Sequence, residues 1–129
     1  MMNPFEQHGA FSWCELITPD VPAAREFYGQ LMGWHLKEGP VAGVPYTVIE
    51  VAGKEIGGMA PPPPNKPDMP PMWGAYITVE DVKKTAEQAE ALGGKVLIPP
   101  MQVETVGQFA LIQDPQGATF CVIEYSSSS

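Results

Sequence analysis

The sequence predicts an α+β protein in which one strand–helix–three-strand module occurs twice. Three observations indicate this: a proline-rich break near the middle, a similar strand-like run on each side of it, and a helix-start signal after each run. The break covers residues 61–71 and holds seven of the 15 prolines, which neither a helix nor a central strand accommodates. We expect it to be a semi-rigid, extended linker between a first module at 10–60 and a second at 72–125, within one domain of 129 residues.

Each module begins with an apolar run of strand length. Residues 13–18 read WCELIT and residues 73–78 read WGAYIT, so Trp, Ile and Thr recur at an offset of 60. Both runs are rich in residues that favour β-structure. We therefore expect a duplicated module in which a strand comes first.

A helix is predicted after each of these strands. Asp20 and Asp81 are N-cap residues, Gly33 ends the first helix, and Gly93 and Gly94 end the second. Apolar residues recur at helical spacing in both segments: Val21, Ala24, Phe27, Tyr28 and Leu31 in the first, and Val82, Ala86, Ala89 and Leu92 in the second. Both helices should lie on a sheet, with the aromatic pair of the first one buried.

Three further strands are expected after each helix, separated by turns rich in glycine. They are residues 34–38, 46–51 and 54–59 in the first module, and 95–98, 108–113 and 118–125 in the second. The turn at 114–117 reads DPQG, and the tail at 126–129 reads SSSS and is expected to be disordered.

The charge and hydropathy of the chain exclude several classes of partner. Lys and Arg total 7 against 15 for Asp and Glu, a formal net charge of −8. This field repels phosphate backbones and anionic lipids, so we expect no nucleic-acid and no membrane partner. No apolar run approaches the roughly 20 residues that cross a bilayer. The first residues show no secretory signal, which predicts a cytoplasmic protein.

Three motifs, in this order and at these spacings, resemble a known family. They are Thr18-Pro19-Asp20 followed by Phe27-Tyr28 and Leu31-x-Gly33-Trp34, then Val79-x-Asp81, then Asp114-Pro115-x-Gly117. Together they cover nearly the whole chain, which resembles the glyoxalase/bleomycin resistance/extradiol dioxygenase superfamily, also called the vicinal oxygen chelate superfamily. The resemblance implies curled mixed β-sheets with the helices outside, enclosing a cup that a second subunit often completes. It therefore predicts a homodimer.

The resemblance also implies where a metal would bind. Metal-dependent members carry a His at the start of each module and a Glu near the end of the second, whereas this sequence has Cys14, Gly74 and Cys121 there. A one-residue shift of the first alignment would place Trp13 at the first position and turn the other face of the strand inward. We expect no metal and no cofactor; a divalent metal would require ligand positions different from these. The two histidines, His8 and His35, are expected at the surface.

If inward positions alternate as the resemblance implies, a mostly apolar set of side chains lines the cup. It comprises Cys14, Leu16, Tyr76, Phe109, Leu111, Thr119 and Cys121. Such a lining suits a small, largely apolar ligand better than a phosphonate, which needs a cationic clamp. The two cysteines could be simply buried, bind a soft ion, react with an electrophile or form a disulfide. Glu15, Glu50 and Glu124 are expected to face solvent or an interface.

These observations leave three hypotheses for the function. The preferred one is a binding protein of this superfamily that holds a small, largely apolar molecule without the usual metal triad. The alternative is a glyoxalase-like lyase or isomerase, or a dioxygenase relative, with non-standard metal ligands or with cofactor-free catalysis by Glu15, Tyr76 or a cysteine. The third is an interaction module without a ligand. No catalytic residue is assigned by the sequence.

Overall fold

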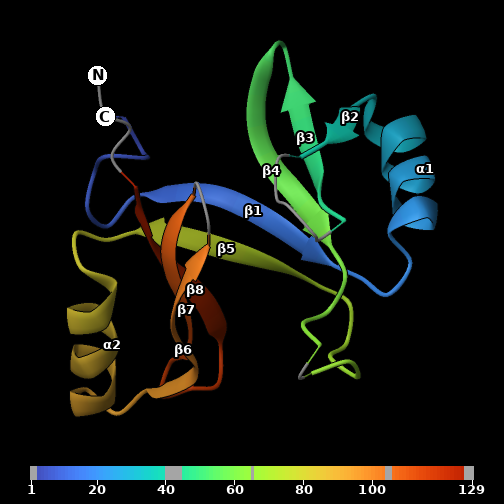
Figure 1. The fold of residues 1–129 in the computed structure, drawn as a ribbon. Coiled ribbons are helices and arrows are strands. Elements are labelled where there is room, and N and C mark those ends of the chain that lie inside the picture. Colours follow the sequence, from blue (N-terminus) through green and yellow to red (C-terminus); the bar gives the residue numbers. More distant parts are fainter. Residues whose placement is uncertain (1–2, 40–44, 65, 104–105, 127–129) are drawn as a thin grey trace. The chain divides into compact units, whose positions relative to one another are not determined.

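The protein consists of two compact units with the same internal topology (Figure 1). The structure is a computed structural model that describes residues 3–39, 45–64, 66–103 and 106–126. One unit, the α1 unit, is formed by residues 13–74; the other, the α2 unit, by residues 1–12 and 75–129. Apart from Ser126, the tail predicted to be disordered lies outside the described residues.

The α1 unit contains one helix and a four-stranded mixed sheet. Its elements are β1 (Phe11–Ile17), α1 (Val21–Met32), β2 (His35–Glu38), β3 (Thr47–Val51) and β4 (Lys54–Ala60). The strand order is β2-β3-β4-β1, in which β4 and β1 are parallel and the other neighbours are antiparallel.

The α2 unit repeats this arrangement. Its elements are β5 (Met72–Thr78), α2 (Val82–Ala91), β6 (Lys95–Val103), β7 (Gly107–Gln113) and β8 (Thr119–Tyr125). The first three residues of β5, including Trp73, belong to the α1 unit, and the first two residues of β1 belong to the α2 unit. The order is β5-β8-β7-β6, with β5 and β8 parallel. The predicted α+β fold class, with strand, helix and three strands occurring twice, is confirmed.

Both helices begin at the predicted capping residues. The Oδ1 atom of Asp20 accepts a hydrogen bond from the backbone N–H of Ala23 at 3.0 Å, and Oδ1 of Asp81 accepts one from Lys84 at 3.0 Å. Gly33 ends α1 with φ of 70°, a conformation that glycine adopts without steric cost. These bonds satisfy amides that the first turn of a helix cannot pair internally.

Strand β6 is longer than the sequence predicts. It continues to Val103, whereas the predicted strand ends at residue 98. The strand runs through Pro99 and Pro100 because it lies at an edge of its sheet, where a missing N–H leaves no neighbouring carbonyl unpaired. Its register with β7 shifts between Ile98 and Met101, at the prolines.

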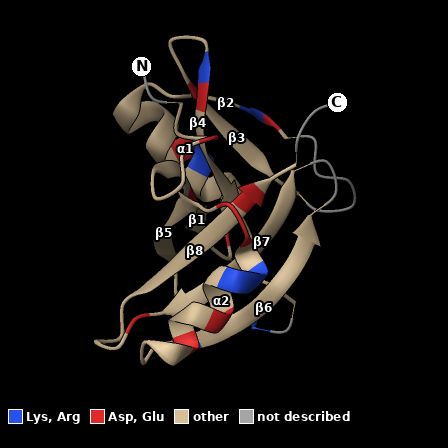
Figure 2. Cartoon of the chain, turned by 90° about the vertical axis from the view of Figure 1, so that its left-hand side faces the viewer, with Lys and Arg blue, Asp and Glu red and all other residues tan. Residues whose placement is uncertain are grey.

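Each helix covers one face of its own sheet. In the α1 unit, Leu16, Ile49 and Met59 form a buried cluster against which residues of α1 pack. In the α2 unit the corresponding cluster is Val79, Val82, Ala110, Ile112 and Val122. Along α2 the basic residues come first and the acidic residues follow (Figure 2). None of the helices in the described part of the chain is long and apolar enough to cross a membrane.

The sequence predicts that both aromatic residues of α1, Phe27 and Tyr28, are buried. This is wrong for Phe27, whose exposed fraction is 59%. Tyr28 is partly buried against the core cluster; its ring stacks on Trp34 with centroids 5.6 Å apart, and its hydroxyl accepts a bond from Nε1 of Trp73 at 3.2 Å. Adjacent helical residues point about 100° apart, so only one of the pair faces the sheet.

The segment before β1 packs on the α2 unit. Oγ1 of Thr78 donates a hydrogen bond to the carbonyl of Pro4 at 2.6 Å, and the ring of Phe5 meets Tyr125 edge-on at 5.2 Å. The backbone N–H of Glu80 donates a hydrogen bond to Nδ1 of His8 at 3.1 Å. His8 thus connects the segment before β1 to the residue that precedes Asp81, the N-cap of α2.

We predict that Tyr28→Ala lowers the free energy of unfolding by about 2–4 kcal/mol, because it removes a ring packed between helix and sheet. Phe27→Ala, the neighbouring control, should change it by less than about 1 kcal/mol, because that side chain is mainly in solvent. Urea denaturation followed by circular dichroism measures both. Equal losses for the two variants would contradict the assigned orientation of α1.

Candidate functional site

The face of each sheet that the helix does not cover is the candidate site, and we call it the helix-free face. Side chains alternate between the two faces along a strand. In the α1 unit Leu16 and Met59 lie in the cluster under α1, so Glu15 and Gly58, which are paired across β1 and β4, belong to the helix-free face.

A chain of hydrogen bonds runs across this face of the α1 unit. Nε1 of Trp13 donates to the hydroxyl of Tyr46 at 2.9 Å, and that hydroxyl donates to Oε2 of Glu15 at 2.7 Å. Trp13 and Glu15 are two residues apart on β1 and so share a face, while Tyr46 directly precedes β3. The phenol is thereby fixed between a donor and a carboxylate.

Gly58 makes room for this phenol. A Cβ atom at position 58 would overlap the hydroxyl oxygen and Cζ of Tyr46 and lie 2.9 Å from its Cε2. Any residue other than glycine would displace the ring and, with it, both hydrogen bonds of the chain. The sequence therefore encodes the chain through a glycine as well as through its three polar members.

An ion-pair network lies on the same face, nearer the edge of the sheet. Nζ of Lys37 is 2.8 Å from Oε2 of Glu50 and 3.0 Å from Oε2 of Glu55. The hydrogen bond to Glu50, and then the one to Glu55, raise the pKa of Lys37 against an opposing effect of burial. The hydrogen bond from Lys37 lowers the pKa of Glu50, again against burial. Both shifts favour the charged forms of Lys37 and Glu50.

In the α2 unit the helix-free face is largely apolar. Ala110, Ile112 and Val122 lie in the cluster with α2, so the alternate residues of β7 and β8 point to the other side. Five of the predicted ligand-binding residues share that side: Tyr76, Phe109, Leu111, Thr119 and Cys121. Cys121 pairs with both Tyr76 and Leu111, and the rings of Tyr76 and Phe109 are 6.4 Å apart.

The structure places the two predicted residues of β1 on the other side of their sheet. Leu16 is 5% exposed in the cluster under α1, and Cys14, two residues earlier, shares its side and is exposed. Trp13 and Glu15 are the β1 residues of the helix-free face. The sequence left open an alignment shifted by one residue, in which Trp13 instead of Cys14 points to this face, and the structure has that orientation.

The three glutamates expected to face solvent or an interface each have a partner within their own unit. Glu15 accepts from Tyr46, and Glu50 pairs with Lys37. Oε1 of Glu124 accepts a hydrogen bond from the N–H of Val82 at 3.1 Å, at the start of α2. Its carboxylate thus pairs with an amide in the first turn of α2. The negative charge also interacts favourably with the positive end of the helix dipole.

The positions at which the resemblance implies metal ligands hold Cys14, Gly74 and Cys121, and none of these residues supplies an imidazole or a carboxylate. In the structure Cys14 lies on the α1 side of its strand, two residues from Leu16. Among residues 3–39, 45–64, 66–103 and 106–126, no three His, Cys, Asp or Glu side chains are grouped to hold a metal ion.

Sequence reasoning missed Tyr46, which it treated only as the start of a strand. The signal was present in the Gly57-Gly58 pair, because consecutive glycines inside a strand often mark a close approach by another group. What the sequence could not show was which aromatic ring approaches there.

The comparisons with known proteins agree with this fold. The sequence model of the Glyoxalase/Bleomycin resistance protein/Dioxygenase superfamily matches residues 10–122. Among solved structures, a hypothetical protein from Bacillus halodurans aligns with a TM-score of 0.68 over 95% of this chain and 99% of its own, at 12% identity. Methylmalonyl-CoA epimerase from Mycobacterium tuberculosis aligns with a TM-score of 0.62 over 92% and 89%, at 14% identity. The chain belongs to the glyoxalase/bleomycin resistance/dioxygenase superfamily.

Two curated relatives are more similar in sequence. "Putative glyoxylase CFP32" of Mycobacterium bovis is 36% identical over 115 residues, which are 87% of this chain and 44% of that protein. "Anthracycline biosynthesis protein DnrV" of Streptomyces peucetius is 34% identical over 128 residues, 88% of this chain and 46% of that protein. This chain therefore spans less than half the length of these relatives.

We predict that Gly58→Ala destabilises the protein by about 1–3 kcal/mol, because the added methyl group overlaps Tyr46. Gly29→Ala is the matched control: its Cβ would make an ordinary contact, 3.6 Å from Cδ1 of Leu36, so it should stabilise α1 by about 0.5–1 kcal/mol. Thermal and urea unfolding measure both changes.

A double variant identifies the source of the Gly58 effect. In a Tyr46→Ala background, Gly58→Ala should cost almost nothing, because the ring it strikes is absent. If Gly58→Ala costs the same in both backgrounds, the close approach of the phenol is not what requires glycine.

Proposed function

We propose that this protein binds a small, largely apolar molecule on its helix-free faces, without a metal triad. The chemistry of the α2 unit supports an apolar ligand, since its helix-free face offers two aromatic rings, a leucine, a hydroxyl and a thiol. Small-molecule sites are typically built in this way, with a mainly apolar lining and a few polar groups that set orientation. On this proposal the residues that contact the ligand are Tyr76, Phe109, Leu111, Thr119 and Cys121.

The observation that carries the proposal is the hydrogen-bond chain of Trp13, Tyr46 and Glu15. Its members hold one another at 2.9 and 2.7 Å, so its polar atoms have fixed directions. Polar groups that are fixed before the ligand arrives lose little entropy on binding and discriminate strongly between ligands. For this reason we propose Trp13, Glu15 and Tyr46 as the polar ligand-binding group of the α1 unit, in place of Cys14 and Leu16.

A second candidate function is cofactor-free proton transfer, and one distance favours it. The phenol of Tyr46 donates to the carboxylate of Glu15 at 2.7 Å, the length of a strong hydrogen bond to an ionised group. A carboxylate and a phenol in such contact can take a proton from a bound molecule and return it elsewhere. The names of the relatives include both a glyoxylase and a protein of anthracycline biosynthesis, so binding and catalysis are both to be tested.

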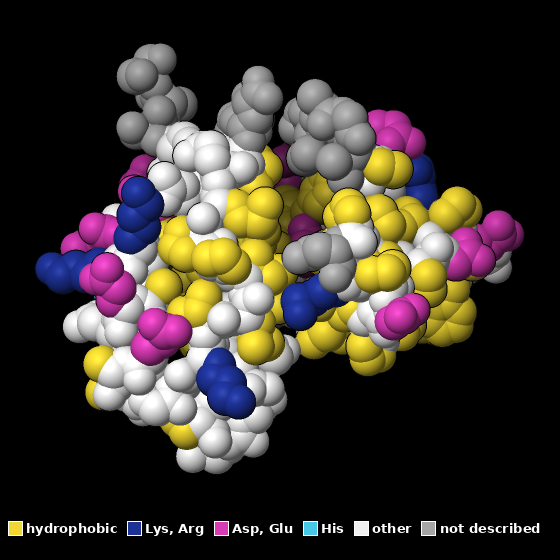
Figure 3. All heavy atoms as spheres, turned by 60° about the horizontal axis from the view of Figure 1, so that its bottom comes forward, with side chains coloured by type: hydrophobic (Ala, Val, Ile, Leu, Met, Phe, Trp, Pro, Cys, Tyr) yellow, Lys and Arg dark blue, Asp and Glu magenta, His cyan; other side chains and the backbone are white. Residues whose placement is uncertain are grey.

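We also propose that the chain acts as a cytoplasmic homodimer with modules at 10–60 and 72–125. The support for a dimer is the apolar surface of α1. There the side chains of Phe27, Leu31 and Met32 are 59%, 62% and 56% exposed. Hydrophobic side chains reach the surface of both units in Figure 3. Contiguous exposed apolar patches are typical of association surfaces. Light scattering coupled to size exclusion measures the mass in solution.

Two ligands test this proposal: 1-naphthol, which is a flat phenol, and an anthracycline. We predict that each binds at about one molecule per chain and raises the melting temperature of the protein. Phe109→Ala should weaken binding of at least one of the two by about tenfold, equivalent to about 1.4 kcal/mol, because a ring of the lining is lost. Isothermal titration calorimetry measures the affinity. Leu92→Ala is the control, since Leu92 belongs to the same unit but is 79% exposed beyond α2.

The same samples separate binding from catalysis and from metal dependence. EDTA should leave the affinity unchanged, and chromatography should recover the ligand unaltered. Loss of binding in EDTA would contradict the metal-free proposal. If the wild-type protein converts the ligand to another compound and the Glu15→Gln variant does not, the result would favour proton transfer over binding alone.

A further inference from the structure

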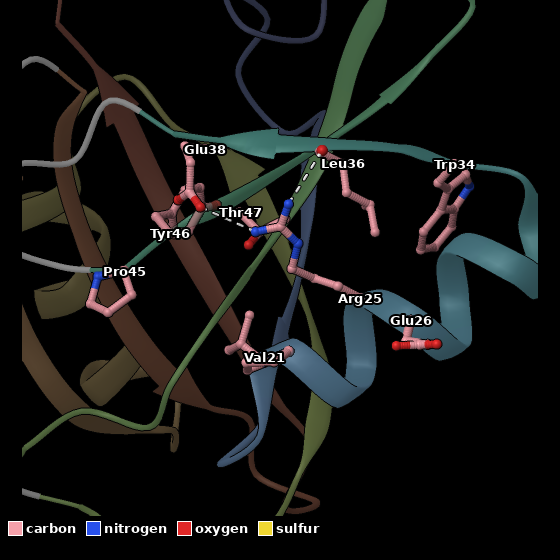
Figure 4. A pocket seen from close by; sticks show the side chains of 10 residues that line it. Val21, Arg25, Glu26, Trp34, Leu36, Glu38, Pro45, Tyr46 and Thr47 are labelled. Carbon is pink, nitrogen blue, oxygen red and sulfur yellow. Dashed lines mark hydrogen bonds and ion pairs between the residues drawn. The ribbon is translucent and has the colours of Figure 1, made fainter.

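A cavity of about 540 Å³ lies between α1 and the strands β2 and β3 of the α1 unit (Figure 4). Its volume is within the range of small-molecule sites. It contains none of the seven residues that the sequence predicted to bind ligand. It is therefore a second place at which the fold can hold a molecule, and Tyr46 alone among the residues proposed for the helix-free faces also borders it.

Arg25 is the cation of this cavity. Its side chain extends from α1 towards β2, where Nη2 donates to the carbonyl of Leu36 at 3.5 Å and Nη1 lies 3.2 Å from Oε1 of Glu38 (Figure 4). The side chain is 33% exposed. The contact with Leu36 holds the guanidinium at the cavity wall.

The carboxylate that now pairs with Arg25 is only loosely held. The side chain of Glu38 is 79% exposed and contacts the guanidinium through one oxygen. Exposed single contacts of this kind add little to stability, because both groups are well hydrated when apart. A guanidinium can instead bind both oxygens of a carboxylate in parallel, which is a stronger and more directional arrangement. Glu38 therefore occupies a place that an incoming carboxylate could take.

The remaining wall defines the rest of the ligand. Val21, Leu36, Trp34 and Pro45 offer apolar contact, and the indole of Trp34 is held in place by its stacking on Tyr28. Glu26 also lines the cavity. Its negative charge, with the net charge of −8 of the whole chain, disfavours ligands with more than one negative charge.

We infer that this cavity binds a small monocarboxylic acid with an apolar body, whose carboxylate displaces Glu38 from Arg25 while its body lies against Trp34 and Leu36. Tyr46 lines this cavity and also joins Trp13 to Glu15, but the cation and the competing carboxylate of the cavity, Arg25 and Glu38, are not part of that chain. Loss of either charged residue therefore tests the cavity and not the chain, and the two proposals can fail independently.

The test is titration of the full chain with phenylacetate and with its uncharged isostere phenylacetamide, followed by NMR chemical shifts of the backbone amides of α1 and β2. Phenylacetate should saturate these shifts at millimolar concentration, with an affinity at least fivefold higher than that of the amide. Arg25→Met should weaken phenylacetate by at least tenfold. Glu38→Gln should strengthen it about threefold, because the competing carboxylate is gone.

Opposite effects of two neighbouring charge changes cannot come from a general loss of fold. Thermal melts should show that both variants are folded, and Glu87→Gln, a matched charge removal on α2 of the other unit, should leave phenylacetate binding unchanged. The inference is overturned if phenylacetate does not bind, if the amide binds equally well, or if Arg25→Met has no effect. It is also overturned if Glu38→Gln weakens binding as Arg25→Met does.

Discussion

The rest of the structure depends on a single constraint: each four-stranded sheet has two faces but its module supplies only one helix. In the α1 unit the helix is used to bury Leu16, Ile49 and Met59, and in the α2 unit to bury Val82, Ile112 and Val122. Because side chains alternate along a strand, every residue next to one of these core positions is directed to the other face. The choice of core thus decides which residues remain on the helix-free face.

The duplicated modules use that second face differently. In the α1 unit it carries a fixed chain of polar groups and, nearer the sheet edge, the ion pairs of Lys37 with Glu50 and Glu55. In the α2 unit the same face is mainly aromatic and aliphatic. The two modules share one topology, but their side chains give one helix-free face its polar groups and the other its apolar surface.

The fold was largely predictable from the sequence because its signals are local. The Asp caps, the apolar helix stripes and the repeated Trp-x-x-x-Ile-Thr run each act within a few residues, and the structure agrees with them. The extension of β6 was missed because whether proline is tolerated depends on a strand being at an edge, a property of the whole sheet. The burial of Phe27 was overestimated because helical spacing shows a stripe but not how much of it a sheet covers. The candidate site was harder, since alternation turns a one-residue error on β1 into the opposite face, and Tyr46 meets Glu15 across 31 positions of sequence.

The prolines of β6 have a consequence for how copies of this protein can meet. A strand at the edge of a sheet normally exposes a row of N–H and C=O groups on which the strand of another molecule can add. Pro99 and Pro100 are consecutive and successive N–H groups of a strand point to opposite sides, so one of them removes an outward donor, and the register of β6 shifts at this pair. The edge strand β2 is only four residues long. Both edges are therefore poor templates for the strand-by-strand addition that produces fibres.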